Sequence, residues 1–290
     1  MSSLRRWCCL VCLLFCSAAS AGRVEIVYPS DETGNDARYN DLHEILRGAL
    51  ERTVADFGPY TLQPSKVRMN EARYLTELKN RQSINIAWSS TSIQKEREFL
   101  PVRIPLRKGL LGYRVAFIAK GTQAKIDQVR TLDDLRKLTI GQGIGWGDVQ
   151  LYSANGIRVA TANYDNLFKM TALGRFDLFP RGIGELMTEY ATFGKDNPNL
   201  AIERNLLIYY PWPYYFFFNQ QDAALKERIE AGVRRMVKDG SFDAIFKKYN
   251  GKVIEQVNFK HRRIIRIRND MLPKETPLND AALWFDPSKD

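Results

Sequence analysis

The chain of 290 residues has no cysteine beyond position 16. Its four cysteines are Cys8, Cys9, Cys12 and Cys16. The rest of the chain therefore has no disulfide framework, no thiolate nucleophile and no thiolate metal site. The fold must be stabilised by the packing of its side chains.

The cysteine-rich start also has no apolar run long enough to span a bilayer. Arg5 and Arg6 precede a short apolar stretch from Trp7 to Phe15, and the small residues Ala19 and Ala21 follow. This stretch is shorter than a membrane-spanning helix requires. A charged start, a short apolar stretch and an Ala-x-Ala end are typical of a cleaved secretory signal.

We predict that residues 1–21 form this signal and that the mature chain begins next to Gly22. An N-terminus that stays anchored is the alternative, but Cys16 follows the bulky Phe15, whereas a lipidated cysteine normally follows a small residue. The sequence therefore predicts a soluble protein exported to the periplasm. About 270 residues remain, enough for one large domain or two smaller lobes.

Histidine is nearly as scarce as cysteine, and the common catalytic motifs are missing. Only His43 and His261 occur, and neither has a second ligand at metal spacing, so both are interpreted as surface or capping residues. Gly-x-Ser-x-Gly and P-loop motifs are absent. We therefore predict no metal, no cofactor and no catalytic residue.

A glycine-rich stretch, residues 141–147, resembles a phosphate loop between a strand and a helix. Trp146 occupies the third glycine position of a dinucleotide motif, so that motif is not met. The free N–H groups of Gly145, Trp146 and Gly147 at a helix start could still bind a small anion. Asp148, the predicted N-cap, would compete for some of these donors.

Positive charge is in excess over the whole chain. Loss of Arg5 and Arg6 with the signal lowers the formal net charge from +10 to +8. A basic surface favours anionic ligands, anionic lipid or nucleic acid. Nucleic acid is not predicted as a partner, because an exported chain rarely meets it.

Predicted strands and helices alternate in two series separated by two long apolar strands. This alternation is typical of parallel sheets covered by helices, and therefore of the α/β class. The predicted lobes are residues 22–118 together with 212–259, and residues 119–211. In the basic tail, residues 260–290, Arg and Ile alternate. Such a tail is usually a solvated edge, but the alternation could also form one strand, and we predict that the tail packs along the first lobe.

Four sequence stretches carry a resemblance to a known family. They are Ser92-Ile93-Gln94-Lys95-Glu96-Arg97, Thr131-Leu132-Asp133-Asp134-Leu135, Gly174-Arg175-Phe176-Asp177 and the segment 237–249. In this order the chain resembles the family 3 extracellular solute-binding proteins, the periplasmic components of amino-acid ABC importers. The resemblance implies a type II periplasmic binding fold, with two α/β lobes joined by two crossing strands and a ligand in the cleft. The crossing strands would be 110–119 and 208–218.

The resemblance also implies roles for particular positions. In the family, an arginine at the Arg97 position holds the ligand carboxylate, and an aspartate at the Gly182 position pairs with its ammonium group. Here Gly182 provides no carboxylate, and Arg181 precedes it. A buried ammonium without a counter-charge is costly. The departures therefore predict a small anionic ligand, with Arg97 and Arg181 facing one cleft from opposite lobes.

Other candidate residues stand at predicted strand ends or in loops. Arg97 and Arg181 each have a structural reading as well, as a surface arginine and as a packing residue. Tyr28 and Trp88 could face the cleft or belong to the core, while Glu185 and Glu189 are interpreted as a solvated helix face. The predicted ligand-binding residues are Tyr28, Trp88, Ser89, Ser90, Thr91, Arg97, Gly145, Trp146, Gly147 and Arg181.

Three functions remain open from the sequence. The first is a monomeric binding protein that closes on its ligand and delivers it to an inner-membrane ABC permease. The second is a ligand-sensing module for a membrane signalling protein. The third is a dehydratase-like enzyme on the same scaffold, with Glu185 near Arg181 as its acid or base.

Overall fold

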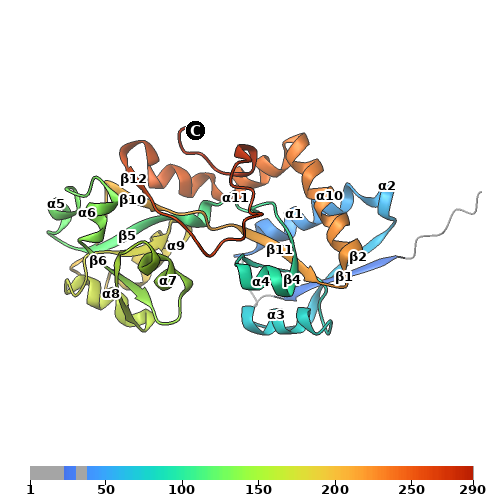
Figure 1. The fold of residues 1–290 in the computed structure, drawn as a ribbon, viewed down its shortest axis with the longest axis horizontal. Coiled ribbons are helices and arrows are strands. Elements are labelled where there is room, and N and C mark those ends of the chain that lie inside the picture. The colour runs from blue at the N-terminus through green and yellow to red at the C-terminus, as the bar shows by residue number, and fades with distance from the viewer. Residues whose placement is uncertain (1–22, 31–37, 290) are drawn as a thin grey trace, which may run out of the picture.

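The computed structural model describes residues 23–30 and 38–289. The predicted signal and its cleavage next to Gly22 lie outside them and stay predictions. The described chain forms two α/β lobes that lie side by side (Figure 1), which confirms the predicted fold class. No helix among these residues combines the length and apolar character needed to cross a membrane.

The first lobe contains a parallel strand pair and a three-stranded antiparallel sheet. The pair is β1 (Val24–Ser30) and β2 (Tyr60–Arg68), and the sheet has the order β3 (Ala87–Ser90), β11 (Tyr214–Asn219), β4 (Phe99–Val102). The helices are α1 (Asn40–Glu51), α2 (Val54–Phe57), α3 (Glu71–Lys79), α4 (Ile93–Glu98) and α10 (Ala223–Asp239).

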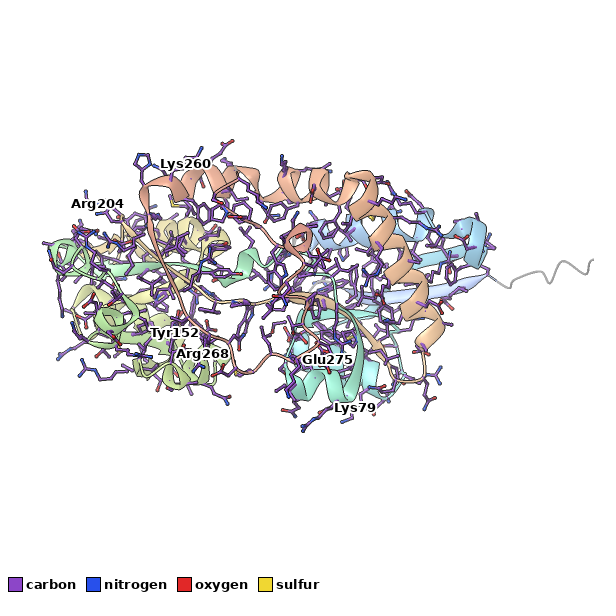
Figure 2. The ribbon with its side chains drawn as sticks, turned by 45° about the horizontal axis from the view of Figure 1, so that its top comes forward. Lys79, Tyr152, Arg204, Lys260, Arg268 and Glu275 are labelled. Carbon is purple, nitrogen blue, oxygen red and sulfur yellow. The ribbon has the colours of Figure 1, made fainter. Side chains whose placement is uncertain are left out.

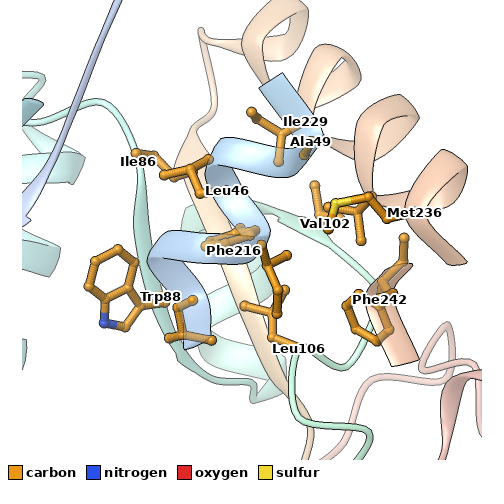
Figure 3. Close-up of a cluster of buried hydrophobic side chains, with 14 of the residues drawn as sticks. Leu46, Ala49, Ile86, Trp88, Val102, Leu106, Phe216, Ile229, Met236 and Phe242 are labelled. Atoms are coloured by element: carbon orange, nitrogen blue, oxygen red, sulfur yellow. The ribbon is translucent and has the colours of Figure 1, made fainter. Parts of the chain in front are cut away.

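The core of this lobe forms where α1 and α10 pack against β11. Side chains at helical spacing on α1, Leu46 and Ala49 among them, belong to one cluster with Phe216 of the sheet, and Ala49 lies beside Ile229 of α10 (Figure 3). Apolar residues three and four apart share one helix face, which explains why this helix buries one side. Gly232 of α10 allows close approach to α1, because a Cβ there would lie 2.2 Å from the Ala49 carbonyl oxygen.

The second lobe is built around β5 (Tyr113–Ala119). It pairs antiparallel with β8 (Phe179–Gly182), β9 (Leu200–Ile202) and β10 (Leu206–Tyr209), while β6 (Thr139–Gly143) and β7 (Arg158–Ala162) form a parallel pair. The helices are α5 (Gln123–Ile126), α6 (Leu132–Arg136), α7 (Gly147–Ala154), α8 (Tyr164–Ala172) and α9 (Ile183–Phe193).

The chain passes between the lobes twice, after β4 and after β10. The first passage ends in a short 3-10 helix, η1 (Leu110–Gly112), and the amide of Tyr210 donates to the Gly112 carbonyl, at 3.2 Å. The second predicted crossing strand is not continuous. Pro211 and Pro213 separate β10 from β11, since proline provides no N–H for a strand ladder.

A long helix, α11 (Ser241–Val257), packs on both lobes. Phe242 belongs to the apolar cluster of the first lobe, whereas Phe246 and Val257 belong to a cluster of the second. The lobe limits drawn from the sequence stay a prediction. The structure adds that residues assigned to the first lobe, including the end of α11, contribute to the core of the second.

The C-terminal tail differs from its prediction. Its strand, β12 (Arg263–Arg266), pairs in parallel with β10 and extends the sheet of the second lobe, so its placement on the first lobe was wrong for this strand. The physical reason is burial, since Ile265 and Ile267 join the second-lobe cluster that contains Ile208. Only later residues of the tail, such as Leu283, enter the first-lobe core.

Candidate functional site

A cavity of about 480 Å³ lies between the two lobes. Its first-lobe side comes from the start of α1 and the passage after β4, and its second-lobe side from β5 and the start of α9. The side chains that define it are Tyr39, Asp41, Arg107 and Tyr214 on one side and Arg114 and Glu185 on the other, with Trp212 between them.

Arg107 is held rigidly on the first-lobe side. Its Nε and Nη2 donate to the two carboxylate oxygens of Asp41, at 2.6 and 2.8 Å, and Nη2 also donates to the Arg38 carbonyl, at 2.5 Å. Its guanidinium lies 5.6 Å from the centre of the Tyr214 ring. A bidentate pair of this kind fixes the orientation of the guanidinium.

Arg114, on β5, lines the second-lobe side of the cavity. Its guanidinium has fewer close partners than that of Arg107. Its Nη2 lies 3.3 Å from Asp148 Oδ1, and its guanidinium lies 5.3 Å from the centre of the Tyr210 ring. Burial raises the pKa of Tyr210, so its neutral hydroxyl donates to Asp148. Nε of Arg114 is buried and has no hydrogen-bond partner among residues 23–30 and 38–289. A buried donor without an acceptor is costly.

Lys95 belongs to a polar cluster that the sequence analysis missed. Its Nζ donates to Ser89 Oγ, at 2.5 Å, and to Glu71 Oε1, at 3.0 Å, while Ser89 Oγ lies 2.5 Å from the same Glu71 oxygen. Burial raises the pKa of Tyr39 and Tyr214 in the cavity wall, and the Glu71 charge adds to the rise. The cluster therefore lies behind these two tyrosines and does not itself line the cavity. The sequence feature that could have pointed to it is the cation two residues before Arg97.

Arg97 lies elsewhere. It is exposed on α4 and lines a separate cavity of about 690 Å³ between this helix and residues 269–278 of the tail. The sequence predicted that Arg97 and Arg181 face one cleft. The structure does not bring them together. Positions 95 and 97 differ by about 200° around a helix, so only one of them can point to the cleft.

Arg181 is buried and engaged within its own lobe. Its Nε and Nη2 donate to the two oxygens of Glu189, at 2.8 and 2.6 Å, and Nη2 lies 3.0 Å from Glu185 Oε2. Its guanidinium stacks 4.6 Å from the centre of the Trp146 ring. The prediction that Glu189 belongs to a solvated face was wrong, because it is buried against Arg181.

The glycine-rich loop is shaped by the same tryptophan. A Cβ at Gly143 would lie 2.2 Å from the Trp146 ring, which therefore covers the end of β6. Gly145 and Gly147 are exposed, and α7 begins at Gly147 with Trp146 as its N-cap instead of Asp148. The Asp148 carboxylate is directed to Arg114 and Tyr210 and does not cap the helix.

The remaining predicted residues lie in or near the first-lobe core. Trp88 is 1% exposed and belongs to that core, and Tyr28 packs 6.1 Å from it, between ring centres. Thr91 donates to Glu96, at 2.6 Å, and the Ser90 carbonyl accepts from Lys95 Nζ, at 3.0 Å. The described residues contain no group of three or more His, Cys, Asp or Glu side chains that could hold a metal ion.

No protein-family model matches this sequence, and no curated protein matches it. Among solved structures, the YckB protein of Bacillus subtilis is similar over 85% of this chain and 97% of its own, with 16% identity and a TM-score of 0.53. The probable amino-acid ABC transporter extracellular-binding protein YtmK of Bacillus subtilis is similar over 79% of this chain and 98% of its own. Its sequence identity is 14%, and its TM-score is also 0.53.

A third structure comes from work on glutathione import via GshT and the cystine ABC importer TcyBC of Streptococcus mutans. It matches 79% of this chain and 95% of its own, with 12% identity and a TM-score of 0.50. At these identities the likeness shows the fold alone. The fold is that of an amino-acid ABC transporter binding protein, which agrees with the resemblance seen in the sequence.

Proposed function

We propose that this chain is a periplasmic solute-binding protein that takes a small anionic solute, of the carboxylate class, between its lobes and delivers it to an inner-membrane ABC permease. The observation that carries the proposal is the pair Arg107 and Arg114, which line one cavity from its two sides. This pair takes the place that the sequence analysis gave to Arg97 and Arg181.

The charges around the cavity favour an anion over an ammonium group. Arg114 keeps a buried N–H without an acceptor in the described part of the chain and only a 3.3 Å approach to Asp148. Glu185 is the acid on the same side, and its Oε2 accepts from the Gly182 amide, at 3.2 Å, and pairs with Arg181. Its carboxylate is therefore already paired within the second lobe, and a carboxylate ligand would meet the Arg114 guanidinium that lines the cavity.

Glu185 gives little support to the enzyme reading. It was the one predicted acid or base near Arg181, and its Oε2 is held by Arg181, at 3.0 Å, and by the Gly182 amide, at 3.2 Å. The aromatic side chains Tyr39, Tyr214 and Trp212 line the rest of the cavity. Such walls suit binding of the apolar part of a small solute.

Ligand binding would couple to lobe movement. A carboxylate that accepts from both Arg107 and Arg114 is bound more tightly when the two sides are close, and so shifts the population toward the closed form. A sensing module would use the same closure. Cross-linking in membranes distinguishes the two, because it identifies a permease or a signalling protein as the partner.

Mass spectrometry of small molecules released from gently purified protein tests the proposal. Released mono- or dicarboxylates without an amino group support it, and calorimetry with the same compound should then give one site per chain. Release of an ordinary amino acid that rebinds tightly would overturn the anionic assignment. Absence of binding by every carboxylate, amine and amino acid tried would overturn the transport role.

A further inference from the structure

The C-terminal residues make a further connection between the lobes, in addition to the two chain passages and α11. The tail descends from Lys260 past Arg268 beside the second lobe and continues to Glu275 beside the first (Figure 2). Its residues contact the rest of the chain at three places. The first is on the second lobe, the second is on the first lobe, and the third is at the passage after β4.

The second-lobe attachment combines strand pairing with a buried asparagine. The pairing of β12 with β10 runs from Arg263 opposite Leu206 to Arg266 opposite Tyr209. Asn155, 4% exposed, then donates from Nδ2 to the Arg268 carbonyl, at 2.8 Å, and accepts from the Arg268 amide, at 3.0 Å. Two reciprocal bonds from one buried side chain fix residue 268 to the second lobe.

The first-lobe attachment begins three residues later. The Ile93 amide, at the start of α4, donates to the Met271 carbonyl, at 3.1 Å. Residues 272–275 and Leu278 then line the cavity beside α4, and Thr276 is 6% exposed. The Met271 side chain still packs against the second-lobe cluster, so the tail passes from the second lobe to the first at this residue. The Arg268 backbone and the Met271 carbonyl are therefore bonded to different lobes, with only two residues between them.

The end of the tail packs against the passage between the lobes that follows β4. The Trp284 ring covers Gly109, where a Cβ would lie 2.3 Å from the ring and where φ is +70°. The Phe285 amide donates to the Lys108 carbonyl, at 2.8 Å, and its own carbonyl accepts from the Tyr113 hydroxyl, at 3.1 Å. Trp284 packs with the first-lobe core and Phe285 with the second.

We propose that residues 263–285 form an interlobe strap that limits how far the two lobes can separate. Three residues of extended chain span about 10 Å at most. Residues 268 and 271 therefore cannot move further apart than this unless one attachment breaks. The strap holds the ligand-free protein in a partly closed form. Less lobe movement is then lost when a ligand binds, so the unfavourable conformational free energy of closure is smaller.

The test measures lobe separation in the ligand-free full-length mature chain. Because this chain has no cysteine beyond position 16, the exposed Ala72 of α3 and Gln150 of α7 can be changed to cysteine and spin-labelled. A flexible Gly/Ser insert next to the exposed Asp270 lengthens the strap and leaves both attachments in place. The same insert after Ser288, beyond the strap, is the matched control.

The strap predicts one narrow distance distribution in the parent and in the Ser288 insertion, and a new population at longer distance in the Asp270 insertion. Asn155→Ala should add a similar population, and circular dichroism shows that each variant is folded. An unchanged distribution in both folded variants would overturn the proposal. So would a parent distribution as broad as that of the Asp270 insertion. Neither outcome depends on the ligand, so failure of the strap is separate from failure of the transport role.

Discussion

Arg181 and Glu189 form a bidentate pair inside the second lobe, with donor–acceptor distances of 2.8 and 2.6 Å and both residues less than a tenth exposed. The Tyr164 hydroxyl donates to the same carboxylate, at 2.7 Å. The arginine that the sequence assigned to a ligand is therefore satisfied by its own lobe. This pair stabilises the lobe, and the cavity depends on other cations.

Glu189→Gln should destabilise the protein strongly. Removal of one partner of a buried pair costs about 3–5 kcal/mol, because the other charge stays buried without compensation. We expect the lower end of this range, since Glu185 remains 3.0 Å from Arg181. Urea unfolding measures the loss. Glu185→Gln is the control, because its side chain is half exposed and should cost less than about 1 kcal/mol. Equal losses of unfolding free energy in the two variants would contradict the larger contribution expected from the buried pair.

Gly232→Ala should destabilise the packing of α10 on α1. Its Cβ would lie 2.2 Å from the backbone oxygen of Ala49, so the helices must move apart, at a cost of about 1–3 kcal/mol or more. Gly251→Ala in α11 is the matched control. No atom of the described residues lies within 4 Å of its Cβ, and the change should stabilise by about 0.5–1 kcal/mol. A thermal melt compares them, and a stabilised Gly232 variant would contradict the observed packing.

The protein should lose stability as the pH rises above the usual tyrosine range. Burial is the main cause that raises the pKa of Tyr74, Tyr210 and Tyr214 in the folded chain. The unfolded chain then releases these protons first, so the free energy of unfolding falls once the pH exceeds about 10. Phenolate absorbance and circular dichroism, followed together, should change in one step. Complete phenolate formation in a folded protein would contradict the burial of these hydroxyls.

Arg107 and Arg97 should differ in their effect on ligand binding. Arg107→Ala removes a buried, directed donor from the cavity and should weaken binding by about 2–5 kcal/mol. Arg97→Ala should leave affinity unchanged, because Arg97 lines the other cavity. The two variants are compared by calorimetry after both are shown to be folded, since Asp41 loses its partner in the first. An equal loss in both would restore the assignment made from the sequence.

The sequence predicted the architecture better than it predicted the site. Strand–helix alternation, which is a local pattern, indicated the α/β class, and the family resemblance of four motifs implied the two-lobe fold. The position of Arg97 outside the interlobe cavity was not readable, because it depends on how a six-residue helix is rotated against the lobe. The burial of Glu189 depends on how α9 packs, and the position of β12 depends on an open sheet edge at β10. Such long-range contacts leave no periodic signal.

Calorimetry of Arg114→Gln tests the central claim most directly. The released carboxylate, or the tightest-binding carboxylate found by screening, is titrated into the parent and into this variant, with the exposed Arg175→Gln of the same lobe as control. The account predicts a loss of about 2–5 kcal/mol for Arg114→Gln and none for Arg175→Gln. Unchanged affinity in a folded Arg114→Gln protein would contradict a ligand site between the lobes that depends on this arginine.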